Sequence, residues 1–294
     1  MSRTLTYFIP ASDLPCSLRA WLKKRGYSHR VLTELMKKDE AVTIENVPVK
    51  LSTFLLSPCT VTLRLPDEET TLVPSDLPLP DVPVLYEDED FAVFDKPAGM
   101  PTHPVHGHIG DTLADFARRR GGQYVFRPVG RLDRNTSGLV AVAKNTFAAS
   151  AAKSMEKTYL AVVEGELSHA GTVDAPIRHK EGSTILREVG EGGDFAVTHY
   201  EPLLCRNGHT LLRLRLETGR THQIRVHMAY LGHPLAGDDL YGGKRDLISR
   251  HALHCTSLSF THPVTGTRVE VVSDLPEDMA GVVGMLNAQC IIYN

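Results

Sequence analysis

Apolar residues recur at helical spacing twice within the first forty residues of the chain. Leu18, Trp21 and Leu22 fall on one helical face. Val31 and Leu35 repeat that spacing in a second stretch. Two runs with the composition of strands follow, which together predict a small α/β module. The elements expected here are helices over 18–25 and 30–38 and strands over 41–49 and 59–65.

Beyond residue 84, short stretches with the alternation of strands outnumber stretches with helical spacing. Many strands with few helices between them indicate an α+β fold, with a mostly antiparallel central sheet flanked by helices and loops. The helices expected here lie at 112–120, 146–156 and 221–231. The strands expected here lie at 84–86, 91–94, 139–143, 158–163, 195–200, 210–217, 253–260 and 267–272.

A proline-rich stretch separates the two regions. Residues 66–83 contain five prolines and an acidic run, a composition that breaks helices and favours extended chain. We therefore expect a module at 1–75, a linker at 76–83 and a larger domain at 84–290. A length of 294 residues with 42% apolar and 23% charged residues suits a two-domain globular protein.

Several protein classes are disfavoured by the sequence. Since no apolar run approaches the roughly 20 residues that cross a bilayer, we expect no membrane partner. The first residues lack the apolar core of a secretory signal, and the five cysteines form no Cys-x-x-Cys pair. We therefore expect a cytoplasmic protein without a disulfide framework or a cysteine-based zinc site.

Charge is concentrated in the two N-terminal helices. The whole chain carries a formal charge of only −3, yet residues 19–38 hold seven Lys or Arg and a single acid, Glu34. Such a run is often no more than a solvated face, but two consecutive basic helices favour a surface that binds phosphate. The residues expected to dock RNA are Lys23, Lys24, Arg25, Arg30, Lys37 and Lys38.

The densest polar motif is Gly-Arg-Leu-Asp-Arg-Asn-Thr-Ser-Gly at 130–138, directly before the apolar run 139–143. It places the Asp133 carboxylate between Arg131 and Arg134, and opposite charge favours the ionised carboxylate. Asn-Thr-Ser-Gly favours a rigid turn that leads into a buried strand. Taken alone, the motif fits a reactive carboxylate or an ordinary ion pair in a surface turn equally well.

Three further segments are candidates for chemistry: Asp-Lys-Pro-Ala-Gly-Met-Pro at 95–101, Lys-Thr-Tyr-Leu-Ala-Val at 157–162, and Leu-Glu-Thr-Gly-Arg-Thr-His-Gln-Ile-Arg-Val-His at 216–227. Each has a plainer interpretation. Tyr159 alone would more often be a core tyrosine, and Ser137 lacks the Gly-x-Ser-x-Gly elbow of serine hydrolases. A loop with His103, His106 and His108 suggests a metal, but no Cys lies near it.

In this order and approximate spacing, the four segments resemble the RluA-type family of RNA pseudouridine synthases, over about residues 84 to 275. The resemblance implies the pseudouridine synthase fold for the larger domain. The N-terminal arrangement of a helix, a basic helix and a hairpin resembles the S4-type RNA-binding module. One position departs from the family pattern: His usually precedes Arg-Leu-Asp, whereas this chain has Gly130.

The resemblance also implies a role for each matching residue. Asp133 corresponds to the nucleophile that starts breaking the N-glycosidic bond of a uridine, and Arg220 to the basic residue that orients it. Tyr159 corresponds to the tyrosine stacked on the target base. The residues that contact the flipped nucleotide or surround it are Arg131, which fills the vacated space, Arg134, Leu132 and Ile224.

The implied activity is the isomerisation of specific uridines in structured RNA to pseudouridine, with ribosomal RNA favoured and transfer RNA as the other candidate. The reaction imports no group and changes no redox state, so we expect neither a cofactor nor a metal, and we expect a monomer. Two alternatives remain. One is a non-catalytic RNA-binding or ribosome-assembly factor on the same fold, and the other is a metal-dependent hydrolase that uses the histidine loop.

Overall fold

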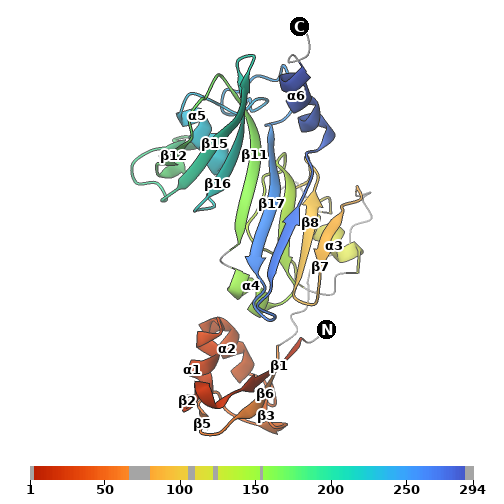
Figure 1. Ribbon diagram of the computed structural model, residues 1–294, viewed down its shortest axis with the longest axis vertical. Helices are drawn as coiled ribbons and strands as arrows, with labels where there is room; N and C mark the ends of the chain where they lie inside the picture. The colour runs from red at the N-terminus through yellow and green to blue at the C-terminus, as the bar shows by residue number, and fades with distance from the viewer. Residues whose placement is uncertain (1–2, 66–79, 105–109, 122–124, 153–154, 289–294) are drawn as a thin grey trace.

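The computed structural model describes residues 3–65, 80–104, 110–121, 125–152 and 155–288. The chain forms a small N-terminal module and a larger body built on one long sheet (Figure 1). The first half of the predicted linker, 76–79, lies outside the described residues, as do His106 and His108. No helix in the described part of the chain has the length and apolar character needed to span a bilayer.

The N-terminal module packs two helices against a four-stranded sheet of order β1-β6-β3-β4. Ser17 and Ser28 cap the two helices by accepting hydrogen bonds from the backbone N–H groups of Ala20 and Val31. Its elements are β1 (Thr4–Ile9), a 3₁₀ turn (Ala11–Asp13), β2 (Cys16–Ser17), α1 (Leu18–Lys24), α2 (His29–Met36), β3 (Val42–Ile44), β4 (Val47–Pro48), β5 (Phe54–Leu55) and β6 (Cys59–Arg64).

The stretch 41–49, expected as one strand, is a tight hairpin of β3 and β4. Its turn residues Glu45 and Asn46 both adopt positive φ, 46° and 64°. Two consecutive left-handed residues make the turn that matches the twist of a two-residue hairpin. Strand β1, which the sequence did not predict, forms the edge beside β6.

The larger body confirms the expected α+β class with a mostly antiparallel sheet. Its ten strands include the path β12-β15-β16-β11-β17-β10-β8-β7, with β18 beside β17 and β9 beside β10. The strands are β7 (Val84–Glu87), β8 (Phe91–Lys96), β9 (Arg127–Pro128), β10 (Ser137–Ala143), β11 (Glu156–Glu164), β12 (Gly171–Asp174), β15 (Val197–Arg206), β16 (His209–Leu216), β17 (Leu253–Thr261) and β18 (Arg268–Val272). A separate hairpin pairs β13 (Ile177–His179) with β14 (Arg187–Val189). The helices are α3 (Leu113–Arg119), α4 (Thr146–Ala151), α5 (Gln223–Tyr230) and α6 (Glu277–Ala288).

One row across the sheet brings distant sequence motifs together. In this row Tyr159 of β11 lies opposite Cys255 of β17, which lies opposite Gly138 of β10, which lies opposite Lys96 of β8. The β10–β17 pairing is parallel, whereas the other pairings in the row are antiparallel. A side chain at position 138 would meet the Cys255 carbonyl oxygen at 2.3 Å, so only glycine permits this approach.

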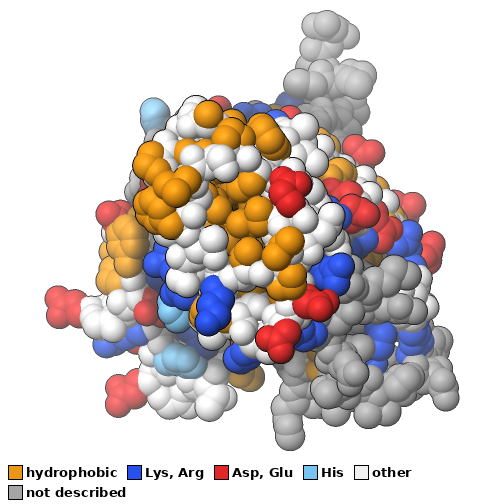
Figure 2. Space-filling model, turned by 90° about the horizontal axis from the view of Figure 1, so that it is seen from below, with side chains coloured by type: hydrophobic (Ala, Val, Ile, Leu, Met, Phe, Trp, Pro, Cys, Tyr) orange, Lys and Arg blue, Asp and Glu red, His pale blue; other side chains and the backbone are white. Residues whose placement is uncertain are grey.

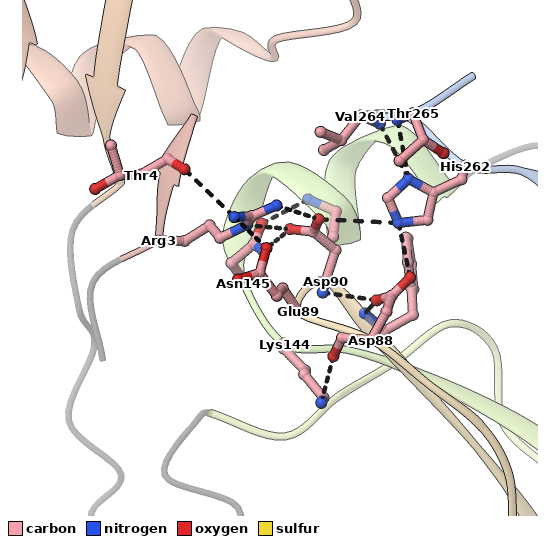
Figure 3. A network of polar contacts seen from close by, with 12 residues as sticks. Arg3, Thr4, Asp88, Glu89, Asp90, Lys144, Asn145, His262, Val264 and Thr265 are labelled. Atoms are coloured by element: carbon pink, nitrogen blue, oxygen red, sulfur yellow. Dashed lines mark hydrogen bonds and ion pairs between the residues drawn. The ribbon is translucent and has the colours of Figure 1, made fainter. Parts of the chain in front are cut away.

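Apolar and polar contacts both join the module to the larger body. Phe147 of α4 is fully buried in the apolar core of the N-terminal module, where its ring stacks on Tyr27 at a centroid distance of 4.1 Å. Arg3, just before β1, donates two hydrogen bonds to the buried Asp90 carboxylate between β7 and β8 (Figure 3). Asn145, the N-cap of α4, also donates to Asp90, so one carboxylate links both parts.

Asp88, Asp90 and His262 in this network have the residue types of a metal site. However, His262 Nδ1 accepts hydrogen bonds from the N–H groups of Val264 and Thr265. The ring proton is therefore on Nε2, which lies 3.0 Å from Asp88 Oδ2 and keeps no lone pair for a metal. Since the Arg3 guanidinium already neutralises Asp90 and the His262 nitrogen that faces the carboxylates carries the ring proton, these residues do not fit a metal ion.

Candidate active site

A pocket of about 320 Å³ opens beside the central row of the sheet. Its walls come from the loop before β10, the end of α4, the start of β11, the end of β16 and the first turn of α5. This volume lies in the range of small-ligand sites. The predicted site residues that line it are Arg131, Leu132, Asp133, Tyr159, Arg220 and Ile224.

Asp133 is fixed by an arginine that the sequence analysis did not select. Arg225 Nη1 donates to Asp133 Oδ2 at 3.1 Å, while its Nε and Nη2 donate to the two oxygens of Asp238 at 2.7 and 2.8 Å. The Asp238 side chain is 1% exposed and that of Arg225 is 7% exposed, whereas 27% of the Asp133 side chain remains accessible. The fork on Asp238 therefore holds the guanidinium rigid, and Nη1 donates to the accessible Asp133 carboxylate.

Arg220, which the family resemblance assigned to this role, has a different contact. Its Nε donates to the carbonyl oxygen of Phe195 at 2.9 Å, and its side chain is exposed at the pocket wall. Five residues separate the two arginines, so Arg220 precedes α5 while Arg225 lies in its first turn. The orientation of Asp133 is thus corrected from Arg220 to Arg225.

The two arginines that flank Asp133 in sequence are not its ion-pair partners. Arg134 Nε donates to the Gly99 carbonyl oxygen at 2.9 Å, and Arg131 is exposed at the pocket mouth. Within the described residues, the groups in ion-pair range of Asp133 are Arg225 and His222. The charge that accompanies the carboxylate therefore comes from a distant segment, and Arg134 lies outside the pocket lining.

The loop that carries Asp133 is tied down on both sides. Thr102 exchanges hydrogen bonds with the backbone N–H and C=O of Leu132. The hydroxyl of Thr136 lies 2.8 Å from Nε2 of the buried His251. Arg250 Nη1 donates to the carbonyl oxygen of Asn135 at 3.0 Å. A carboxylate held this way loses little further freedom on meeting a substrate.

Lys96 closes the floor beneath this loop. The side chain is fully buried, and its Nζ donates to the carbonyl oxygens of Pro97, Met100 and Arg134 at 2.8–3.1 Å. All three ammonium donors are thereby used. Burial lowers the pKa of Lys96 to about 7, although the nearby Asp133 charge acts in the opposite direction.

Tyr159 lines the pocket from β11 and is 6% exposed. Burial raises the pKa of its phenol well above the ordinary value, and the Cys255 thiol and the Asp133 charge act in the same direction. The phenol therefore stays protonated at neutral pH and presents a neutral ring to the pocket.

His222 is a second residue that the sequence analysis did not assign to the site. It adopts positive φ (58°) at the start of α5, and its Nε2 lies 3.8 Å from Asp133 Oδ2. Its Nδ1 is in hydrogen-bond contact with the Tyr241 hydroxyl at 2.9 Å, and that hydroxyl also accepts the backbone N–H of Arg187. Burial lowers the pKa of His222, although the nearby Asp133 charge acts in the opposite direction.

The basic N-terminal residues lie apart from this pocket. Figure 2 views the module from below, where apolar side chains cover much of the face turned away from the larger body. Phe8, Phe54 and Leu56 are 64%, 60% and 78% exposed. The six basic residues expected to dock RNA are all exposed on or just after α1 and α2.

The sequence contains a partial indication of the site residues that the sequence analysis missed. Arg225 and His222 belong to the same Thr-Gly-Arg-Thr-His-Gln-Ile-Arg segment that was selected, but the motif does not show which arginine faces Asp133. Asp238 lies in the segment Gly-His-Pro-Leu-Ala-Gly-Asp-Asp, whose acidic residues only the fold brings behind Arg225.

Comparison with known proteins identifies the class. A family model described as RNA pseudouridylate synthase matches residues 90–230. An uncharacterized RNA pseudouridine synthase of Bacillus subtilis, YjbO, is 38% identical over 91% of this chain and 98% of its own length. The chain belongs to the RluA-type family of RNA pseudouridine synthases, which are isomerases.

The names of some relatives specify the RNA on which they act. A ribosomal large subunit pseudouridine synthase D of Xylella fastidiosa is 38% identical over 78% of this chain and 76% of its own length. Among solved structures, human RNA Pseudouridylate Synthase Domain Containing 1 superposes with a TM-score of 0.57 and 28% identity, covering 71% of this chain and 95% of that one. The chain is thus an enzyme that forms pseudouridine in RNA.

Proposed function

We propose that this enzyme isomerises specific uridines of structured RNA by flipping the base into the pocket and using Asp133 as the nucleophile. The observation that carries the proposal is the accessible Asp133 carboxylate, held by Arg225 and enclosed in one pocket with Tyr159. Large-subunit ribosomal RNA is the favoured substrate, because relatives over most of the chain carry that name. Transfer RNA is the second candidate.

In the proposed reaction, an Asp133 oxygen attacks the ribose C1′, the C1′–N1 bond breaks, and uracil leaves with the bonding pair. The uracil turns and bonds C1′ through C5, which displaces the carboxylate. The proton on C5 is lost and N1 gains one, so the net change is an isomerisation. An alternative in which the carboxylate promotes elimination to a glycal uses the same residue.

Base flipping follows from the chemistry, because C1′ and C5 cannot both be reached inside a stacked helix. Unstacking costs a few kcal/mol, which contacts to the protein offset. In the proposal, the ring of Tyr159 stacks on the flipped base, Leu132 and Ile224 pack around it, and the exposed Arg131 occupies the space that it leaves.

The N-terminal module is proposed to dock RNA through the basic residues of α1 and α2, as an S4-type module would. Each phosphate contact adds to the salt dependence of binding. Changing Lys23, Lys24, Arg30, Lys37 and Lys38 to Ala is expected to weaken RNA binding and flatten that dependence. Unchanged binding in this variant would remove the module from the RNA interface.

The central test is Asp133→Asn, with Asp239→Asn as a matched control on an exposed carboxylate that pairs with Arg245. Release of tritium from C5-labelled uridine in total RNA reports the new C5–C1′ bond directly. Asp133→Asn is expected to abolish release while binding RNA at least as tightly, because a negative charge near the phosphates is removed. Retained turnover would overturn the nucleophile assignment, as would a loss of tritium release that is fully accounted for by weaker RNA binding.

A further inference from the structure

The side chain of Lys157 places an ammonium group in the pocket. The proposed mechanism assigns no role to this group. It lies two residues before Tyr159 on β11 and lines the same pocket. Its Nζ donates one hydrogen bond, to the carbonyl oxygen of Val129 at 2.8 Å. An ammonium has three N–H donors, so two remain for a ligand.

The charge on Lys157 also has no neutralising partner. Across the described ranges, no carboxylate lies in ion-pair range of its Nζ. Burial lowers the pKa of Lys157, with the Cys255 thiol acting weakly the other way. A partly desolvated cation without a counter-charge is a strong site for an anion, since binding restores the missing interaction.

Gly130 creates the space that this ammonium occupies. The residue is exposed and has a φ of +77°, and a Cβ there would lie 2.9 Å from Lys157 Nζ. A side chain at position 130 and the ammonium therefore compete for one place. This is also the position at which the chain departs from the His of the family pattern.

We propose that Lys157 binds a backbone phosphate that flanks the flipped uridine. The inference rests on the proposed use of the pocket for that nucleotide. RNA carries one permanent anion per nucleotide, and Lys157 lies next to the exposed Gly130, at the side of the pocket that opens to solvent. Among the other cations of the wall, Arg225 bonds two carboxylates, Arg220 bonds a backbone carbonyl, and Arg131 is the residue proposed to fill the space that the base leaves.

The first arm of the test compares Lys157→Met, which keeps an unbranched apolar stem, with Lys244→Met, which removes one charge from an exposed site outside the pocket. Lys157→Met is expected to raise KM and Kd about tenfold or more. It should reduce the slope of log Kd against log salt by about 0.7–0.9, the value for one phosphate. The kcat at saturation should change little, and Lys244→Met should resemble the wild type.

The second arm identifies the oxygen that is bound. Two substrate RNAs carry a neutral methylphosphonate, one on the 5′ side and one on the 3′ side of the target uridine, and one of them should bind the wild type as weakly as ordinary RNA binds Lys157→Met. Combining the variant with that modified RNA should cause no further loss, because both changes remove the same contact. Additive losses would overturn the proposal, as would a Lys157→Met defect confined to kcat with an unchanged salt slope.

Gly130→Ala tests the same contact without changing the lysine, because the added methyl group would displace the Lys157 ammonium. It therefore gives a second result if Lys157→Met does not fold. It should weaken binding of ordinary RNA in the wild type but not in Lys157→Met. Binding unaffected in both backgrounds would overturn the proposal. The outcome is separable from the proposed function, because Asp133→Asn tests turnover and Lys157→Met tests affinity and salt dependence.

Discussion

Arg225 contacts Asp133 with a single N–H at 3.1 Å while two other N–H groups of the same guanidinium grip Asp238. The two ion pairs are unequal. The buried Asp238 accepts two hydrogen bonds and sets the position of the arginine, whereas the accessible Asp133 accepts one. In the proposed reaction the Asp133 carboxylate changes its bonding during turnover, and a partner that is held by Asp238 keeps its place while that happens. The arrangement predicts different effects for the two arginines of the segment.

Arg225→Met is expected to leave Asp238 buried and unpaired. Breaking a buried ion pair from one side costs about 3–5 kcal/mol, and the variant should lose that much stability in urea unfolding, together with turnover. Arg220→Met removes an exposed side chain and should stay within about 0.5 kcal/mol of the wild type. Arg225→Lys keeps the charge but not the fork, and a folded, fully active Arg225→Lys protein would contradict the positioning role.

Gly138→Ala is expected to destabilise the protein by about 2–5 kcal/mol, through backbone strain and overlap with β17. The φ of 107° and the 2.3 Å approach to the Cys255 carbonyl oxygen leave no room for a methyl group. Gly281→Ala in α6 is the matched control, because a Cβ there meets nothing within 4 Å. That substitution should stabilise by about 0.5–1 kcal/mol, as expected for a helix interior, and both values can be read from urea midpoints.

Stability is expected to fall as the pH drops below about 6.5. Burial lowers the pKa of His251 to about 2, with Arg225 and Arg250 acting in the same direction, and burial also lowers those of His227 and His254. In the unfolded chain these histidines take up protons as the pH falls below about 6.5. In the native state they stay neutral until the pH reaches their lowered pKa values. Each such histidine costs up to about 1.4 kcal/mol per pH unit across that window.

His251→Asn should reduce this pH slope in urea unfolding measured between pH 7 and 5, because it removes the histidine that is held neutral over the widest range. The exposed His169→Asn serves as the control and should leave the slope as it is. A slope that is the same in all three proteins would contradict the assignment to buried histidines.

Phe147→Ala is expected to separate the unfolding of the module from that of the larger body. Truncating a buried Phe costs about 3–5 kcal/mol and here removes the stack on Tyr27. The chain has a single tryptophan, Trp21, which is buried in the N-terminal module. Its fluorescence should report a transition at lower urea than far-ultraviolet circular dichroism does in the variant, whereas the wild type should give one coincident transition. Coincidence in both would show that the contact does not couple the parts.

Local pattern was sufficient to predict most helices and most long strands. The helices at 18–25, 30–38, 112–120 and 221–231 lie within a residue or two of those observed. Strands β12, β13 and β14 were missed because each has only three or four residues and shows no sustained alternation. Helix α6 was missed although its first turn is acidic, as helix starts often are.

The same distinction between local pattern and tertiary packing applies to the candidate site. Asp133 and Tyr159, which their own loop and strand place, line the same pocket, as the motifs led us to expect. The partner of Asp133 was misassigned because it depends on how α5 meets the loop before β10, and two arginines five residues apart give no sequence signal for that choice. The close approach of Gly130 and Lys157 depends on the positive φ of Gly130 and on the position of strand β11. The sequence of either segment alone predicts neither.

The seating of Phe147 in the core of the N-terminal module has a geometric consequence. A module attached only through a proline-rich connection would sample many positions, and a bound RNA would select among them. Here an aromatic stack and the Arg3–Asp90 pair fix the distance between the basic helices and the pocket. If both surfaces contact the same RNA, a uridine qualifies by lying at the right separation from a second feature of that molecule, so the protein would measure spacing as well as shape.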